Sequence, residues 1–198
     1  RRELEALRAQ LREIGAGSLP PQAVACFRLL MFMGARLGEI LTLKWEWVDF
    51  QRAEARLPDS KTGRKTIHFP APALEVLASL PRIDGNPYVI FGERKGAHLV
   101  GVQGQWRRVS SAAAVKGWRQ GEDPKAAALV EGLTRQLDRE PTFAECQQEA
   151  KAQGLTLPPG LSTLRIHDLR HAFASVAAGS GMGPVSYTHL TLPTILLV

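Results

Sequence analysis

The 198-residue sequence has only two cysteines, Cys26 and Cys146, far apart in the chain. Neither belongs to a metal-type spacing, so a reduced interior fits better than a disulfide scaffold. No apolar run approaches the roughly 20 residues of a membrane span, and no signal peptide opens the chain. We therefore expect a cytoplasmic protein without a membrane segment.

The composition allows a real hydrophobic core and favours one domain, since 44% of the residues are hydrophobic. The 25 basic residues outnumber the 19 acidic ones, which gives a net charge of +6. Such a balance is compatible with a polyanionic partner, because neutralised phosphates release counterions. A basic protein that never binds nucleic acid is nearly as compatible with it.

Hydrophobic periodicity predicts helices in the first half of the chain, followed by a small sheet. Leucines at helical spacing predict an amphipathic helix over 1–14, and Pro21 opens an apolar helix expected over 22–43. Alternating residues over 45–69 predict an antiparallel meander with turns at 51–54 and 59–65. A short helix is expected over 72–80 and a buried strand over 88–91.

The second half begins with a basic stretch, 92–109, and continues into a helical region, 110–160. Asp123 and Pro124 predict the start of a helix that runs to about Arg139. Thr142 with Glu145 predicts a capping box for another helix, ended by Gly154. No chemistry is evident in 110–160. The predicted fold is mainly α with a small antiparallel β-sheet.

Three groups of residues could carry chemistry. Arg36 lies in an apolar segment, and Glu39 follows three residues later. The two residues form either an isolated structural ion pair or a site in which Glu39 orients the Arg36 guanidinium toward an anion. Lys61, in the predicted turn, is either a solvated charge or a mobile proton donor.

The third group is His167, Arg170 and His171, which share one face if a helix begins near Asp168. This face could form a phosphate cradle or simply a polar face near a helix start. The two histidines also have the spacing of a zinc-protease helix, but no third ligand is evident and Asp168 replaces the expected glutamate.

The ordered set of these motifs resembles the tyrosine recombinases of the phage integrase type, over about Leu4 to Gly183. The motifs are Gly-Ala-Arg-Leu-Gly-Glu-Ile-Leu from Gly34, Leu-Lys-Trp from Leu43, Ser-Lys-Thr-Gly from Ser60, and His-Asp-Leu-Arg-His-Ala-Phe-Ala-Ser from His167. The set is much more specific than its parts.

The resemblance implies a role for each matching residue. Arg36 and Arg170 would hold the non-bridging oxygens of the scissile phosphate, Lys61 would protonate the departing 5′ oxygen, and His167 would handle protons. Glu39 and His171 would support them. Members of the family use neither a metal nor another cofactor. Backbone contacts to double-stranded DNA are expected from basic residues near the hairpin and after it: Arg64, Lys65, Arg94, Lys95, Arg107 and Arg108.

The sequence departs from the family pattern at its C-terminal end. The turn and the nucleophilic tyrosine expected after the His-x-x-Arg helix are missing, and Tyr187 follows Arg170 too closely to replace them. Residues 185–198 resemble a non-native, adapter-derived tail, so 1–184 is interpreted as a catalytic-domain fragment. Within it, 110–160 is interpreted as a helical insertion.

These interpretations predict DNA strand exchange through a 3′-phosphotyrosine, by a full-length protein that forms a homo-oligomer on DNA. The chain as written would be inactive in strand cleavage. A type IB topoisomerase-like enzyme and a non-catalytic DNA-binding protein are the alternatives.

Overall fold

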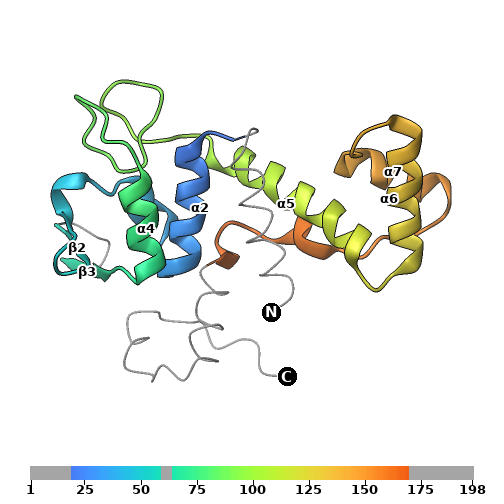
Figure 1. Ribbon diagram of the computed structural model, residues 1–198, viewed down its shortest axis with the longest axis horizontal. Coiled ribbons are helices and arrows are strands. Elements are labelled where there is room, and N and C mark those ends of the chain that lie inside the picture. The colour runs from blue at the N-terminus through green and yellow to red at the C-terminus, as the bar shows by residue number, and fades with distance from the viewer. Residues whose placement is uncertain (1–18, 59–63, 170–198) are drawn as a thin grey trace, which may run out of the picture.

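The computed structural model describes residues 19–58 and 64–169, which form two lobes joined by one long helix, α5 (Figure 1). The first lobe contains α2 (Pro21–Met33), α3 (Leu37–Leu41), α4 (Ala71–Ser79) and a three-stranded sheet. The second contains α6 (Pro124–Leu137) and α7 (Phe143–Ala152). Helix α5 (Val102–Gln120) runs between them, and the 3-10 turns η1 (Trp45–Trp47) and η2 (Gly160–Thr163) complete the described elements. The predicted α-rich fold is confirmed.

The apolar helix expected over 22–43 is not continuous. It ends at Met33, and Gly34 caps it in the left-handed conformation, with φ +57°, while its N–H donates to the Leu30 carbonyl at 3.1 Å. This conformation strains residues that carry a Cβ and favours glycine. A second, five-residue helix, α3, starts after Arg36. The prediction was wrong because apolar spacing continued across a glycine that stops the helix.

The predicted meander is confirmed: β1 (Val48–Asp49), β2 (Glu54–Leu57) and β3 (Lys65–His68) are antiparallel in the order β1-β2-β3. Ala55 pairs with Ile67, and both are buried against the main core. Two residues assigned to turns belong to strands instead. Glu54 begins β2, and Lys65 begins β3 opposite Leu57.

The segment 88–91 is buried as predicted at Val89 and Ile90, but it is not a strand. It forms only isolated bridges, from Tyr88 to Lys44 and from Phe91 to His98. Its hydrogen bonds go to two different parts of the chain, so no regular ladder develops.

Helix α5 contributes to two separate hydrophobic cores. Its N-terminal half places Trp106, Val109 and Ala113 in the core shared with α2, α4 and the sheet. Its C-terminal half packs on α6 and α7 through Trp118 and neighbouring residues. The region expected to be distinct, 110–160, is helical, but its first boundary falls inside α5 rather than at a junction.

The predicted starts of α6 and α7 are confirmed. The Asp123 carboxylate accepts hydrogen bonds from the backbone N–H groups of Lys125, at 2.9 Å, and Ala126, at 3.3 Å. The backbone N–H of Thr142 donates to Glu145 Oε2 at 2.7 Å, and the Glu145 N–H donates to Thr142 Oγ1 at 3.3 Å. Helix α6 ends at Leu137 rather than near Arg139, because Asp138 adopts the left-handed conformation.

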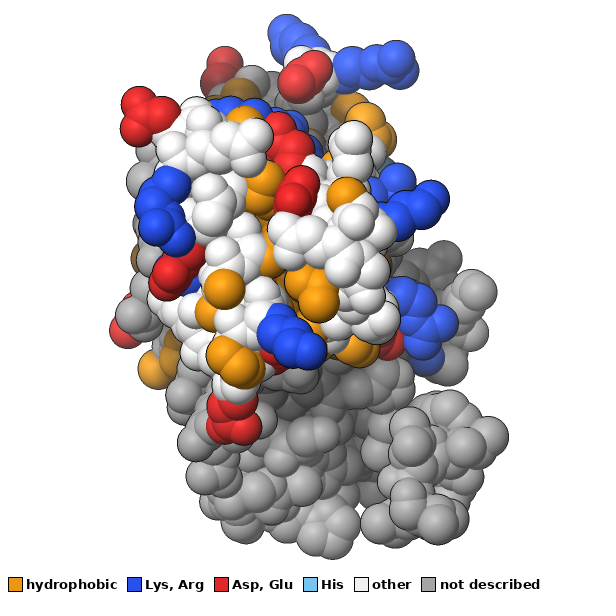
Figure 2. Space-filling view, turned by 90° about the vertical axis from the view of Figure 1, so that its right-hand side faces the viewer, with side chains coloured by type: hydrophobic (Ala, Val, Ile, Leu, Met, Phe, Trp, Pro, Cys, Tyr) orange, Lys and Arg blue, Asp and Glu red, His pale blue; other side chains and the backbone are white. Residues whose placement is uncertain are grey.

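The outer face of the second lobe has no patch of one charge. Figure 2 views this end of the molecule and shows acidic and basic side chains interspersed, with hydrophobic side chains in the furrow between. A groove of about 410 Å³ lies between α6 and α7 and is lined by Leu129, Leu133 and Leu155 among others. Over the described ranges, no helix combines the length and the apolar character needed to cross a bilayer.

Candidate active site

The break between α2 and α3 places Arg36 at the N-cap of α3, in an extended conformation with φ −74° and ψ 147°. An N-cap is normally Ser, Thr, Asp or Asn, whose side-chain oxygen accepts a backbone N–H. A guanidinium has no acceptor, so Arg36 cannot cap the helix in this way. The position therefore breaks a local folding rule, which is typical of functional residues.

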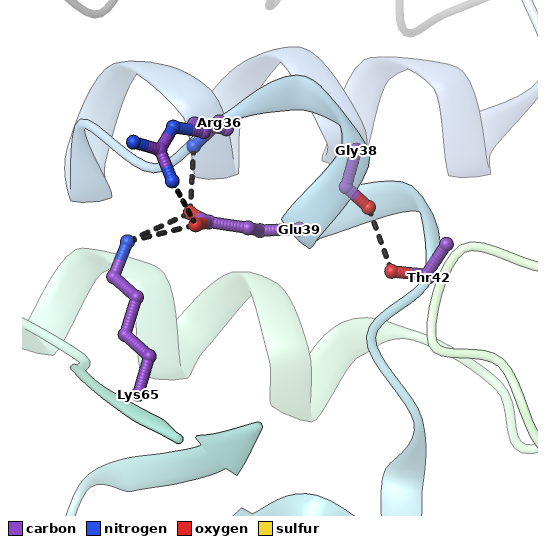
Figure 3. A network of polar contacts seen from close by, with 5 residues as sticks. All are labelled: Arg36, Gly38, Glu39, Thr42 and Lys65. Atoms are coloured by element: carbon purple, nitrogen blue, oxygen red, sulfur yellow. Dashed lines mark hydrogen bonds and ion pairs between the residues drawn. The ribbon is translucent and has the colours of Figure 1, made fainter. Parts of the chain in front are cut away.

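Glu39 accepts a backbone hydrogen bond at the start of α3 and pairs with two cations, Arg36 and Lys65 (Figure 3). The backbone N–H of Arg36 donates to Glu39 Oε2 at 2.9 Å, and Arg36 Nη1 lies 3.4 Å from Oε1. The ammonium of Lys65, from β3, donates to both carboxylate oxygens at 2.9 Å. The Glu39 side chain is only 8% exposed, so two cations rather than water satisfy its charge.

The pKa of Glu39 is set by opposing effects. Burial raises it, but the Lys65 hydrogen bond, the Arg36 backbone N–H and the charges of both cations outweigh burial. The pKa of Glu39 therefore lies below its ordinary value. Glu39 stays ionised at neutral pH and keeps holding both cations.

Arg36 uses only part of its hydrogen-bonding capacity on Glu39. A guanidinium has five N–H donors in a planar fork. Within residues 19–58 and 64–169, Nη1 is the nitrogen that bonds Glu39, and Nε and Nη2 contact no acceptor. The side chain is 36% exposed. A guanidinium that is held through one nitrogen and has unbonded donors on the others can donate hydrogen bonds to a phosphate oxygen.

The second arm of the candidate site is the segment 164–169, which packs on α5. Trp106 Nε1 donates to the Leu164 carbonyl at 2.7 Å, and the Trp106 ring meets Phe27 edge-on at 5.3 Å. The backbone N–H of Arg165 then donates to Asp168 Oδ2 at 2.7 Å. Asp168 and Leu169 have a helical backbone, which agrees with the condition set for the third group of residues, and Leu169 is buried.

His167 is exposed at this helix start. The other predicted residues of the arm, Arg170 and His171, lie outside the described residues, as does Lys61. Tyr187, the expected helix over 1–14 and the tail over 185–198 lie outside them as well. The structure therefore brings Arg36, Glu39 and Lys65 together, and places His167 on a separate segment.

Lys65 is the member of this cluster whose position the sequence did not reveal. It was expected to contact DNA from a turn, yet it begins β3 and is 23% exposed, with its ammonium on Glu39. The alternation of buried and exposed residues along the strand could have revealed the position of Lys65. Leu57 and Ile67 are buried, and Lys65, two residues before Ile67, shares the face of the sheet on which Ile67 lies.

The other predicted DNA-binding residues are exposed and dispersed. Arg64 precedes β3, Arg94 and Lys95 lie in the loop between α4 and α5, and Arg107 and Arg108 lie on α5. That loop leaves the C-terminal end of α4, whereas β3 leads into its N-terminal end (Figure 1). The loop that contains Arg94 and Lys95 therefore begins at the end of α4 opposite the one that β3 leads into.

A metal site has no support in the described part of the chain, where no three His, Cys, Asp or Glu side chains gather. The spacing of His167 and His171 gave the zinc alternative, and His171 lies outside the described residues. The two cysteines are buried, and burial raises the pKa of Cys26 to about 12. Neither thiol has the character of a nucleophile.

Comparisons with solved structures give the same fold at low sequence identity. The Tn1549 transposon integrase, in complex with circular intermediate DNA, matches with a TM-score of 0.52 and 16% identity over 95% of this chain. A variant of that integrase, in complex with transposon right end DNA, gives 0.50 and 16% over 90%. The chain spans about half of those structures, 55% and 53% respectively. No curated protein matched the sequence.

A family model gives the assignment. The model described as "Phage integrase family" matches residues 2–186, which is nearly the whole chain. That range includes Arg36, Glu39 and Lys65, together with the segment that carries His167. The chain belongs to the phage integrase family.

Proposed function

We propose that the protein is a tyrosine site-specific recombinase, which cuts and rejoins double-stranded DNA through a 3′-phosphotyrosine. The observation that carries the proposal is Arg36, held by a buried carboxylate with part of its fork open. Family membership and the solved integrase–DNA complexes support it. The partner is duplex DNA, on which the whole protein acts as a homo-oligomer.

In the proposed reaction, a tyrosine oxygen attacks the scissile phosphorus and forms a phosphotyrosine while the bond to the 5′ oxygen breaks. Arg36 and Arg170 bind the non-bridging oxygens, where negative charge develops in the transition state. Lys61 gives a proton to the departing 5′ oxygen, and His167 handles the tyrosine proton. The covalent bond conserves the phosphodiester energy, so rejoining to a 5′ hydroxyl needs no ATP.

The exposed basic residues have a second proposed role, contact with backbone phosphates. Such contacts position the duplex without reading its sequence. The residues proposed to make these contacts are Arg64, Arg94, Lys95, Arg107 and Arg108. Lys65 differs from them because its ammonium is already bound to Glu39.

We propose further that this chain lacks the nucleophile. Tyr187 would then play no part, and these 198 residues would bind duplex DNA without cutting it. Binding should weaken steeply with salt, because phosphate contacts release counterions.

The test is covalent trapping on a nicked duplex that carries the recombination site. The full-length protein should give a protein–DNA adduct that survives denaturation, and its hydrolysis should yield phosphotyrosine. The 198-residue chain should bind the same duplex and give no adduct. No adduct from the full-length protein would contradict the recombinase proposal. An adduct from the 198-residue chain would show that the nucleophile is present.

A further inference from the structure

Lys65 makes contacts that a DNA-binding lysine would not need. It begins β3, and its Nζ lies 2.9 Å from each oxygen of Glu39, a residue 26 positions away in the sequence. Its side chain is 23% exposed, which is well below that of the exposed arginines on the sheet, such as Arg56 at 65%. The contact joins the sheet to the start of α3.

The arrangement leaves Lys65 poorly placed to donate a proton or bind a phosphate itself. An ammonium has three donors, and two point at Glu39. Releasing them would leave a carboxylate that is 8% exposed with Arg36 alone, at 3.4 Å. A buried carboxylate that loses its closer cationic partner is destabilised, so the ammonium should stay where it is.

The charge of the cluster shows what Lys65 contributes. Arg36 and Glu39 alone would be neutral as a pair, and Glu39 would draw the guanidinium toward itself. Lys65 neutralises that carboxylate, so the cluster has a net charge of +1 and Arg36 keeps its attraction for an anion. Lys65 also fixes the carboxylate, which in turn orients Nη1 of Arg36.

We propose that Lys65 is a positioning residue for strand cleavage, acting through Glu39 on the Arg36 guanidinium. This inference rests on the proposed function. It assigns Lys65 to the orientation of the phosphate-binding arginine rather than to DNA contact or proton donation.

The first test compares Lys65→Met and Lys65→Arg in the full-length protein. Adduct formation is measured in single turnover on the nicked duplex at saturating protein, alongside the affinity for DNA. Lys65→Met should slow adduct formation at least about 10-fold, the scale of a mispositioned transition-state donor. Affinity should change less than about twofold, since the Lys65 ammonium is bound to Glu39 rather than to a phosphate. Lys65→Arg should restore most of the rate.

A double-mutant cycle with Arg36→Lys separates positioning from general stability. If Lys65 acts through the Arg36 fork, Lys65→Met should cost much less once the fork is gone. Equal costs in the two backgrounds would overturn the proposal. So would Lys65→Met forming adduct at the wild-type rate. If Lys65→Met fails to fold, Lys65→Gln and the Lys65→Arg rescue provide the same comparison.

A substrate with sulfur in place of the 5′ bridging oxygen distinguishes proton donation from positioning. A thiolate leaves without a proton, so this substrate should rescue Lys61→Ala. It should not rescue Lys65→Met, and rescue would overturn the proposal in favour of a proton donor. Absence of any adduct with the wild-type protein would instead contradict the recombinase proposal, so the two failures differ.

Glu39 supplies a readout that does not depend on DNA or catalysis. Its carboxyl pKa can be followed by ¹³C NMR in the wild-type protein and in Lys65→Met. Because the Lys65 hydrogen bond and charge lower this pKa, it should rise in the variant. An unchanged pKa would show that Lys65 does not hold Glu39 in solution and would overturn the proposal.

Discussion

Each lobe contains a helix whose third residue is a glutamate that accepts a hydrogen bond from the backbone N–H of the N-cap residue. The two glutamates differ in where their cationic partners come from. In α7, Glu145 accepts from the Thr142 backbone N–H at 2.7 Å and pairs with Arg139 at 2.6 and 3.0 Å. All three residues lie within seven positions of one another. In α3, Glu39 does the same for Arg36, but its second cation comes from β3.

The difference lies in the N-cap residue. Thr142 can accept a hydrogen bond and completes the α7 capping box, whereas Arg36 cannot complete the α3 box. At the start of α7, local residues stabilise the helix. At the start of α3, the N-cap residue is an arginine rather than a residue that caps a helix well. Glu39 holds this arginine while its other donors stay unbonded. This departure from the local rule supports the role proposed for Arg36.

The largest expected effects come from a matched pair of tryptophans on α5. Trp106 and Trp118 are both buried, and each donates its indole N–H to a carbonyl, of Leu164 at 2.7 Å and of Pro158 at 2.8 Å. Substitution by alanine should cost about 3–5 kcal/mol of unfolding free energy at either position. Urea unfolding of both variants measures this cost.

Activity should separate the two variants. Trp106 anchors the segment that leads to His167, so Trp106→Ala should slow adduct formation at least about 10-fold at temperatures where it is folded. Trp118→Ala serves as the control and should stay within about twofold of wild type. Equal losses of activity in both variants would mean that the second lobe also shapes the site.

The next predictions compare unfolding free energy with adduct formation for substitutions at the two N-cap positions, Thr142 and Arg36. Thr142→Ala should cost about 1 kcal/mol of unfolding free energy and leave adduct formation unchanged. Arg36→Ser provides α3 with a normal cap and loses one partly exposed ion pair. Its unfolding free energy should change by less than about 1 kcal/mol, while adduct formation is lost. If Arg36→Ser destabilised the protein severely, the arginine would be structural.

The sequence predicted most of what local chemistry dictates. The meander, the Asp123 cap and the Thr142–Glu145 box each follow from residues close together in the chain, and each is confirmed. The pairing of Arg36 with Glu39 is present as the sequence suggested, while the part of this pair in catalysis stays a prediction. The continuous helix over 22–43 failed because apolar spacing hides a glycine stop, which only the left-handed φ of Gly34 reveals.

Contacts between distant elements were beyond sequence reasoning. The Lys65–Glu39 pair depends on how the sheet docks against α3, and a lysine beside a turn gives no sign of it. The Trp106–Leu164 hydrogen bond spans 58 positions in the same way. Helix α5 joins two cores because its two halves have differently directed apolar faces, and the sequence did not predict one continuous helix there.

The smallest expected effect is a pH dependence confined to the α7 cap. The Arg139 hydrogen bonds, then those from Thr142, lower the pKa of Glu145 from 4.5 to about 2. A lowered acid pKa means that the stabilisation is complete above pH 4.5 and is lost as pH falls toward 2. Urea unfolding at several pH values should show a shallower acid decline in Glu145→Gln and in Arg139→Gln. An unchanged decline in both variants would contradict the cap geometry.

The measurement that tests the central claim most directly is the single-turnover rate of adduct formation for Arg36→Lys against wild type, at saturating protein. Lysine retains the positive charge and loses the planar fork. We predict a loss of at least about 100-fold, the scale of removing one transition-state donor, with DNA affinity nearly unchanged. A rate close to wild type would show that the open guanidinium at the start of α3 does not bind the reacting phosphate.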